Sequence, residues 1–140
     1  MTDIKKTLLK LSKSKKIFLY DKILKKNISY NQFFLNSIKL ANFLKVEKNL
    51  KKNDVVFCKI DQSSLFYELI FACLILKCKF CPISNDWIAE DQKKLKVEIK
   101  PALEIYSTNN LFYSTEIKKD IKEIISNLDL EYNFLLISSS

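Results

Sequence analysis

Four cysteines are the residues of this chain best suited to bind a metal or to form a disulfide. They are Cys58, Cys73, Cys78 and Cys81, and the last two form a C-x-x-C pair. Tetrahedral zinc needs four ligands, but the sequence offers neither a second such pair nor a histidine. Cys58 and Cys73 lie inside apolar runs, where a thiol acts as a small hydrophobic group. We therefore interpret the cysteines as structural, expect no metal site, and infer a reducing, cytoplasmic setting.

Glycine is absent from all 140 residues, as is histidine. Average usage of about 7% would place roughly ten glycines in a chain of this length. Without them, no Gly-rich loop can hold a nucleotide phosphate within these residues. The sequence also shows no cluster of acidic residues that would form a ligand site. We therefore expect no catalytic residue within this chain, and any phosphate-binding loop should lie beyond Ser140.

The net charge of +8 comes from lysine alone, because the chain has no arginine. The lysines are spread along the whole sequence, whereas a nucleic-acid interface needs a clustered basic stripe and base reading favours arginine. The longest apolar run, at residues 65–76, contains Glu68 and falls short of the roughly 20 residues that span a membrane. The lysine-rich N-terminus has no signal-peptide core. We expect no nucleic-acid partner and no membrane span.

Local patterns fix the start of one helix and the form of one turn. Ser29 and Gln32 make a capping-box pattern, in which the serine hydroxyl accepts a first-turn amide and the glutamine bonds back to the Ser29 N–H. This predicts a helix that begins at Tyr30 and has one apolar face. At the turn 50–54, Asn53 should adopt a positive φ angle in place of the missing glycine.

Apolar runs and helical periodicities alternate along the whole chain. Strands are predicted at 17–20, 55–60, 80–83, 102–106 and 132–137. Helices are predicted near 4–11, from Tyr30, at 65–77, from a cap at Asp86, and from about Thr115 after a loop at 109–113. This alternation predicts an α/β fold with a parallel, doubly wound sheet, and the length predicts a single domain, residues 1–140.

Four segments, in this order, resemble landmarks of the AMP-forming adenylate-forming synthetases and ligases. This family includes acyl-CoA synthetases, luciferases and the adenylation domains of non-ribosomal peptide synthetases. The segment ISYNQF at 28–33 resembles the family's L-T-Y-x-E-L, and KKND at 51–54 resembles its K-P-G-D turn. LKCKFCPI at 76–83 is similar to L-K-A-G-x-x-x-x-P-[IL], shortened and without its glycine, so that either Cys78 should take a left-handed conformation or the turn should be remodelled. LLISSS at 135–140 resembles the strand that enters the loop [ST]-S-G-[ST]-[ST]-G-x-P-K.

The resemblance implies that residues 1–140 are an incomplete N-terminal domain with an acyl-CoA synthetase-like fold. The parent enzyme would use ATP and Mg²⁺ to convert a carboxylic acid into an acyl-adenylate, and would then transfer the acyl group to the thiol of coenzyme A or a carrier protein. Ser139 and Ser140 would be the first residues of its phosphate loop, at the carboxyl end of a strand where ligands of open α/β sheets bind. The chain alone is expected to be inactive and to bind no cofactor.

Two other readings of the sequence stay open. One is a flavodoxin-like binding or interaction module without catalysis, which would need a complete ligand site at its topological switch point. The other is an interaction or regulatory remnant that keeps a synthetase-like fold without using it.

Overall fold

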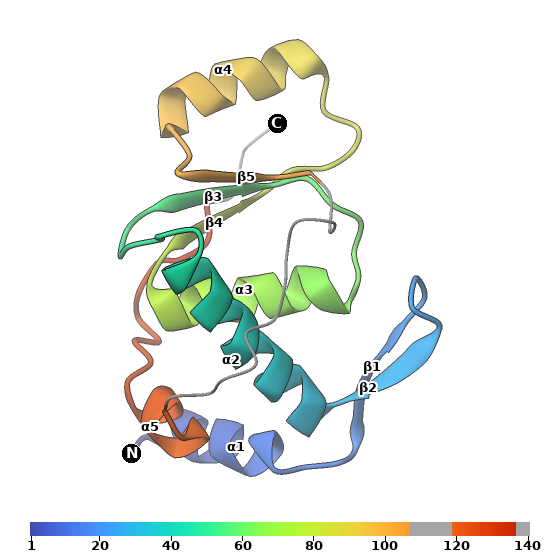
Figure 1. Ribbon diagram of the computed structural model, residues 1–140, viewed down its shortest axis with the longest axis vertical. Helices are drawn as coiled ribbons and strands as arrows, with labels where there is room; N and C mark the ends of the chain where they lie inside the picture. The colour runs from blue at the N-terminus through green and yellow to red at the C-terminus, as the bar shows by residue number, and fades with distance from the viewer. Residues whose placement is uncertain (107–118, 137–140) are drawn as a thin grey trace.

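The computed structural model describes residues 1–106 and 119–136, and they form a layered α/β structure (Figure 1). A small sheet lies between helix α4 on one face and helices α2 and α3 on the other. Helices α1 and α5 lie beyond α2, and a β-hairpin projects to one side. The predicted helix start near Thr115, the loop at 109–113, and Ser139 and Ser140 lie outside the described residues.

The N-terminal part contains a hairpin that the sequence did not predict. After α1 (Asp3–Ser12), strands β1 (Ile17–Asp21) and β2 (Lys26–Ser29) pair antiparallel, and α2 (Tyr30–Val46) follows. The prediction that residues 17–20 join the parallel sheet is therefore wrong. Among the residues that the structure describes, β1 pairs only with β2, because a turn of four residues folds the chain back on itself.

The parallel sheet is built from three consecutive strands. β3 (Val55–Cys58), α3 (Ser64–Leu76), β4 (Lys79–Pro82), α4 (Ala89–Ile99) and β5 (Leu103–Ile105) follow one another, with the strand order β4-β3-β5. The first crossover connection, through α3, leads from β3 to β4 at one edge of the sheet. The second, through α4, leads back past β3 to β5 at the other edge. Right-handed crossovers in opposite directions place α3 and α4 on opposite faces, as Figure 1 shows. The predicted doubly wound α/β fold is confirmed.

Residues 134–136 extend this sheet beyond β4. Phe80 donates its N–H to the carbonyl of Phe134, and Leu136 donates its N–H to the Phe80 carbonyl at 2.7 Å. Within residues 119–136 the pairing is a single parallel bridge between Phe80 and Leu135, so the strand predicted at 132–137 does not begin at residue 132. The preceding residues form α5 (Ile121–Ser126) and a turn in which Tyr132 bonds back to Asp129, which delays the pairing.

The predicted start of α2 is confirmed, but only half of its capping box forms. The Ser29 hydroxyl accepts the N–H of Gln32 at 3.1 Å. The Gln32 side chain donates to Asn36 at 2.6 Å and does not bond back to Ser29. An i,i+4 amide pair on the helix surface thus replaces the second half of the box.

Residues with positive φ end several elements in place of glycine. Asn53 has φ 72°, as predicted. Lys77, not Cys78, takes the left-handed position that ends α3, with φ 57°. Cys78 then donates its N–H to the Cys73 carbonyl at 3.0 Å, which is the Schellman arrangement. Of the two expectations for this position, the structure has the remodelled turn and not a left-handed Cys78.

The predicted cap at Asp86 is also wrong. Helix α4 begins after Ile88, which provides no side-chain capping bond. Asp86 instead donates its N–H to the Ser84 hydroxyl at 3.2 Å, so it belongs to a turn that precedes the helix.

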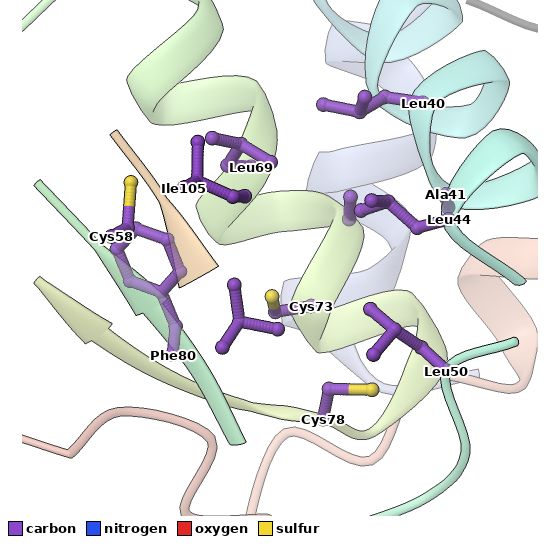
Figure 2. Packing of buried hydrophobic residues seen from close by; sticks show 12 residues of the cluster. Leu40, Ala41, Leu44, Leu50, Cys58, Leu69, Cys73, Cys78, Phe80 and Ile105 are labelled. Atoms are coloured by element: carbon purple, nitrogen blue, oxygen red, sulfur yellow. The ribbon is translucent and has the colours of Figure 1, made fainter. Parts of the chain in front are cut away.

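The main core lies between the sheet and helices α2 and α3. Figure 2 shows Leu40, Ala41 and Leu44 of α2 facing Leu69 and Cys73 of α3, with Phe80 and Ile105 of the sheet beside them. Cys58, Cys73 and Cys78 belong to this cluster and are fully buried. Their interpretation as structural hydrophobic groups is confirmed for Cys58 and Cys73.

Candidate functional site

The carboxyl ends of the three parallel strands meet at one edge of the sheet, where open α/β folds bind ligands. Asp61 follows β3, and Ser84 and Asn85 follow β4. The Asn85 amide donates to the Asp61 carboxylate at 2.8 Å and so links the two loops. A cavity of about 440 Å³ opens here, and its lining residues are Ile60, Asp61, Gln62, Phe66, Pro82, Ile83, Ser84 and Asn85.

This cavity does not fit a nucleoside triphosphate by itself. Its polar lining consists of Gln62, Ser84, Asn85 and the carboxylate of Asp61, and none of the lining residues is cationic. Triphosphate binding needs cations or a bound metal to offset its charge. In residues 1–106 and 119–136, no group of three metal-binding side chains lies close enough to hold an ion. Phosphate binding at this edge would therefore need further residues.

Residues 134–136 run parallel to β4 and therefore toward the same edge. Leu135 packs into the core on the α3 side, whereas Leu136 packs with Phe57 and Ile83 on the other side. This alternation is that of a strand buried on both faces. Ser139 and Ser140 come three and four residues after Leu136, and their role as the start of a phosphate loop stays a prediction.

A polar cluster lies on the face of the sheet that α4 covers. The Lys96 ammonium group of α4 bonds to the Tyr106 hydroxyl at 2.7 Å and to the Glu104 carboxylate at 3.1 Å. Tyr106 also donates to Glu104 at 2.6 Å. The ammonium group lies 5.4 Å from the centre of the Phe57 ring, a cation–π contact. Sequence reasoning missed this cluster, although Glu104 and Tyr106, two residues apart on a predicted strand, had to share a face.

The pKa shifts of these three groups indicate that the cluster serves to hold α4 against the sheet. Hydrogen bonds with Tyr106 and then Glu104 raise the pKa of Lys96, so this lysine stays charged and is no nucleophile. The same bonds, first from Tyr106 and then from Lys96, lower the pKa of Glu104. Desolvation, together with the bond to Glu104, raises the pKa of Tyr106. Each group therefore keeps its ordinary charge state at neutral pH. This favours the interpretation that the cluster attaches α4 to β5, and not that it performs acid–base catalysis.

A second polar link joins the hairpin to α3. The buried carboxylate of Asp21 accepts the N–H and the hydroxyl of Ser64 at 2.9 and 2.5 Å. Its other oxygen accepts the N–H groups of Ile23 and Leu24, both at 2.8 Å. Burial acts to raise the pKa of Asp21, but these hydrogen bonds outweigh it, and the net pKa lies below its usual range. Nothing in the sequence pattern paired residue 21 with residue 64.

The four thiols are poor nucleophiles. Burial raises the pKa of Cys58 to about 12 and that of Cys78 to about 11. Burial also raises the pKa values of Cys73 and Cys81. Because the thiolate is the reactive form, none of these cysteines is suited to catalysis at neutral pH.

Comparison with known proteins gives a result at the level of structure. No protein-family model matches the sequence, and no curated protein matches it. Solved structures of adenylate-forming enzymes do match it. NpsA of Klebsiella oxytoca, in complex with 3-hydroxyanthranilyl-AMSN, covers 94% of this chain at 16% identity with a TM-score of 0.62.

Two further solved structures match the chain with a similar TM-score. The luciferase-like enzyme from the nonluminescent Zophobas morio mealworm covers 73% of this chain at 18% identity, with a TM-score of 0.62. ATP-bound MatB from Rhodopseudomonas palustris covers 71% at 18% identity, with a TM-score of 0.61. The chain therefore has the fold of the N-terminal subdomain of adenylate-forming enzymes. It spans only 26%, 24% and 20% of the lengths of these three structures.

Proposed function

We propose that this chain is the N-terminal part of an ATP-dependent adenylate-forming enzyme. Such a parent enzyme activates a carboxylic acid as an acyl-adenylate and transfers the acyl group to a thiol, either coenzyme A or a carrier protein. Its ATP and Mg²⁺ would bind with residues outside this chain, and the chain alone has no catalytic activity. Its substrates would be a small carboxylic acid and a nucleotide, in the cytoplasm.

The observation that carries this proposal is the order of the parallel segments. Residues 134–136 bond to β4, the second parallel strand, so the spatial order is 134–136, β4, β3, β5. In a flavodoxin-like sheet, with order 2-1-3-4-5, the fourth strand lies next to the third. The observed order therefore disfavours the flavodoxin-like alternative. The similarity to NpsA, which extends over nearly the whole chain, also supports the proposal.

The chemistry of the carboxyl edge supports the same proposal. The cavity beside Ser84 and Asn85 has hydroxyl and amide groups but no cation, so it is incomplete as a phosphate site. Residues 134–136 lead toward this edge. A loop of hydroxyl groups, backbone amides and a lysine entering there would supply the missing donors.

The first test is the coding sequence that follows Ser140, together with the activity of the protein it encodes. We expect the pattern G-[ST]-[ST]-G-x-P-K to continue from Ser139 and Ser140, and we expect the longer protein to catalyse pyrophosphate exchange with ATP that depends on a carboxylic acid. The isolated 140-residue chain should show no exchange above background with any acid. Exchange by the isolated chain, or a longer protein without acid-dependent exchange, would contradict the proposal.

A second test addresses Ser140 within the longer protein. Replacement by alanine, and more so by valine, should slow the adenylation half-reaction and weaken the apparent affinity for ATP, because the hydroxyl and the space around the phosphate are lost. Ser126→Ala is a matched control, since the hydroxyl of Ser126 bonds only to the Lys122 carbonyl of its own helix at 2.7 Å. Unchanged rates and affinities for both Ser140 variants would remove this residue from the phosphate site.

A further inference from the structure

The β1–β2 hairpin exposes apolar side chains in a place where nothing in the described structure covers them. It projects away from the helices and the sheet (Figure 1). At its turn, the Ile23 side chain is 59% exposed and that of Leu24 is 57% exposed. On the adjoining strand β1, Ile17 and Tyr20 are 57% and 56% exposed. Single exposed apolar residues are common on proteins, but a group of them on a protruding element marks an interaction surface.

The turn holds these side chains outward through a rigid connection. The buried carboxylate of Asp21 accepts the N–H groups of both Ile23 and Leu24 while it bonds to Ser64 of α3. The turn closes at Lys25, which has φ 55°. The exposed position of Ile23 and Leu24 is therefore fixed by hydrogen bonds to the protein core.

Lysines surround this apolar pair. Lys22, Lys25 and Lys26 flank Ile23 and Leu24, and all three are exposed. Lysines occur along the whole chain, but residues 1–46 are richer in lysine and much poorer in acidic residues than the rest. Residues 1–46 contain eleven lysines and two acidic residues, a net charge of +9, and one of the two acids is the buried Asp21. Residues 47–140 contain thirteen lysines and fourteen acidic residues, a net charge of −1.

We propose that the hairpin tip, residues 22–26, docks on the surface of an anionic lipid bilayer. Ile23 and Leu24 enter the boundary between headgroups and acyl chains, while the three lysines contact lipid phosphates. Apolar insertion and attraction to anionic lipids add together in this mode of binding. In the part of the chain that the structure describes, no helix has the length and apolar character to cross a bilayer. Attachment through two apolar side chains and three lysines would be peripheral and reversible.

The exposed aliphatic side chains favour a bilayer over a nucleic acid. Lysines alone would serve either partner, because both present rows of phosphates. Nucleic acids, however, offer stacked bases and a charged backbone, and aliphatic side chains gain little from either. Residues 22–26 also lack the arginines that read base edges and the aromatic groups that stack on bases, and Tyr20 on the adjoining strand is a single ring.

Sedimentation of the 140-residue chain with lipid vesicles tests this proposal. Vesicles of phosphatidylcholine with about one third phosphatidylglycerol should bind the chain, and pure phosphatidylcholine should bind it far more weakly. Replacing Lys22, Lys25 and Lys26 by glutamine should lower the partition coefficient roughly 100-fold, since each lysine near an anionic surface contributes about fivefold. The double variant Ile23→Asn and Leu24→Asn should lower it roughly tenfold or more.

Matched controls distinguish the effect of the tip residues from the effect of changing charge or hydrophobicity elsewhere in the chain. Val46→Asn with Val97→Asn removes two apolar side chains that are 63% and 75% exposed elsewhere. Glutamine at the exposed Lys51, Lys52 and Lys93 removes three charges outside residues 1–46. Both controls should keep the partition coefficient within about twofold of the unmodified chain. Circular dichroism of every variant identifies any that has lost its fold.

A fluorescent label at the tip reports contact with the bilayer directly, without a comparison of how tightly variants bind. All four native cysteines are buried, so a thiol introduced by Leu24→Cys can be labelled selectively with an environment-sensitive dye. Anionic vesicles should shift the emission of this label to the blue, whereas a label at Val97→Cys should not respond. The proposal is overturned if the Leu24→Cys label does not shift, if tip and control variants bind alike, or if duplex DNA binds more tightly than the vesicles with the same dependence on the tip.

Discussion

The two faces of the parallel sheet are covered in different ways. Toward α2 and α3 lies a cluster of twelve buried residues, nearly all of them apolar. Toward α4 the buried cluster has only three members, Phe57, Cys81 and Ile83. Helix α3 buries six of its residues, whereas α4 buries only Gln92. On the α4 side, the bonds of Lys96 to Glu104 and Tyr106 supplement a small apolar contact.

This difference indicates that the two faces contribute unequally to stability. Burial of apolar area supplies most of the free energy of folding, and here it is concentrated between the sheet, α2 and α3. A helix with few buried contacts opens at lower free energy than the core does. We therefore expect α4 to open locally while the α2–α3 face stays folded.

The largest effect should come from a cavity on the α2–α3 face. Leu44→Ala removes a fully buried side chain of α2 and should lower the free energy of unfolding by about 2–5 kcal/mol. Urea unfolding followed by circular dichroism measures the loss. The matched control is Val97→Ala on α4, where the side chain is 75% exposed and the change should stay within about 0.5 kcal/mol. Equal losses at the two sites would show that the faces do not differ.

A second prediction concerns the one buried carboxylate that anchors this face to the hairpin. Asp21→Asn places an amide group against the N–H and hydroxyl of Ser64, and should cost about 1.5–3 kcal/mol. The carboxylate has its pKa lowered by folding, so it stabilises the protein above the unfolded pKa of about 3.9. That contribution is lost as the pH falls through the folded pKa.

Urea unfolding at a series of pH values tests this sign. The unmodified chain should lose stability as the pH falls below about 4, and Asp21→Asn should lose less over the same interval. Glu131→Gln, at an exposed carboxylate, is the control and should behave like the unmodified chain. An identical pH dependence for Asp21→Asn and the unmodified chain would contradict the assignment.

The contrast between Asp21 and the sheet shows what sequence patterns can predict. β3 and β4 appeared as apolar runs because they are buried on both faces, and this pattern needs no knowledge of distant partners. β2 did not appear, since Lys26–Ser29 is short and its turn contains Ile23 and Leu24 in place of glycine or asparagine. That turn depends on the buried carboxylate of Asp21, which is a tertiary contact.

The candidate site shows the same limit. The edge of the sheet could be predicted from the strand order, because polar residues follow parallel strands at their carboxyl ends. The bond between Asp61 and Asn85 and the attachment of Lys96 to Glu104 depend on side chains from separate elements. Ser139 and Ser140 stay predictions that rest on resemblance.

A third prediction compares the ends of the two helices that flank the sheet. Both end at a lysine with positive φ, Lys77 after α3 at 57° and Lys100 after α4 at 47°. Glycine adopts this conformation without steric cost, so Lys77→Gly should raise the free energy of unfolding by about 0.5–1 kcal/mol. If α4 opens separately, Lys100→Gly should slow hydrogen exchange within α4 and leave global stability nearly unchanged. Equal global gains would show that α4 unfolds only with the core.

The smallest effect should come from the polar cluster under α4. Tyr106→Phe removes a hydroxyl that bonds Lys96 and Glu104 and should lower global stability by only about 0.5 kcal/mol, because the ring is half exposed. Amide exchange within α4 should nevertheless become faster. Tyr67→Phe, at another exposed tyrosine, is the control and should leave exchange in α4 unaltered. A global loss as large as that of Leu44→Ala would mean that the cluster is central to the fold.

The position of β3 at the centre of the sheet has a consequence for synthesis. Its first partner, β4, is complete at Pro82, so β3, α3 and β4 together form one right-handed crossover within residues 55–82. The pairing of β3 with β4 joins residues that are closer in sequence than those of the pairing of β3 with β5, so less loop entropy must be lost when it forms. The second partner, β5, begins only at Leu103. As the chain leaves the ribosome, the β3–α3–β4 unit should therefore assemble first and serve as the template on which the later strands are added.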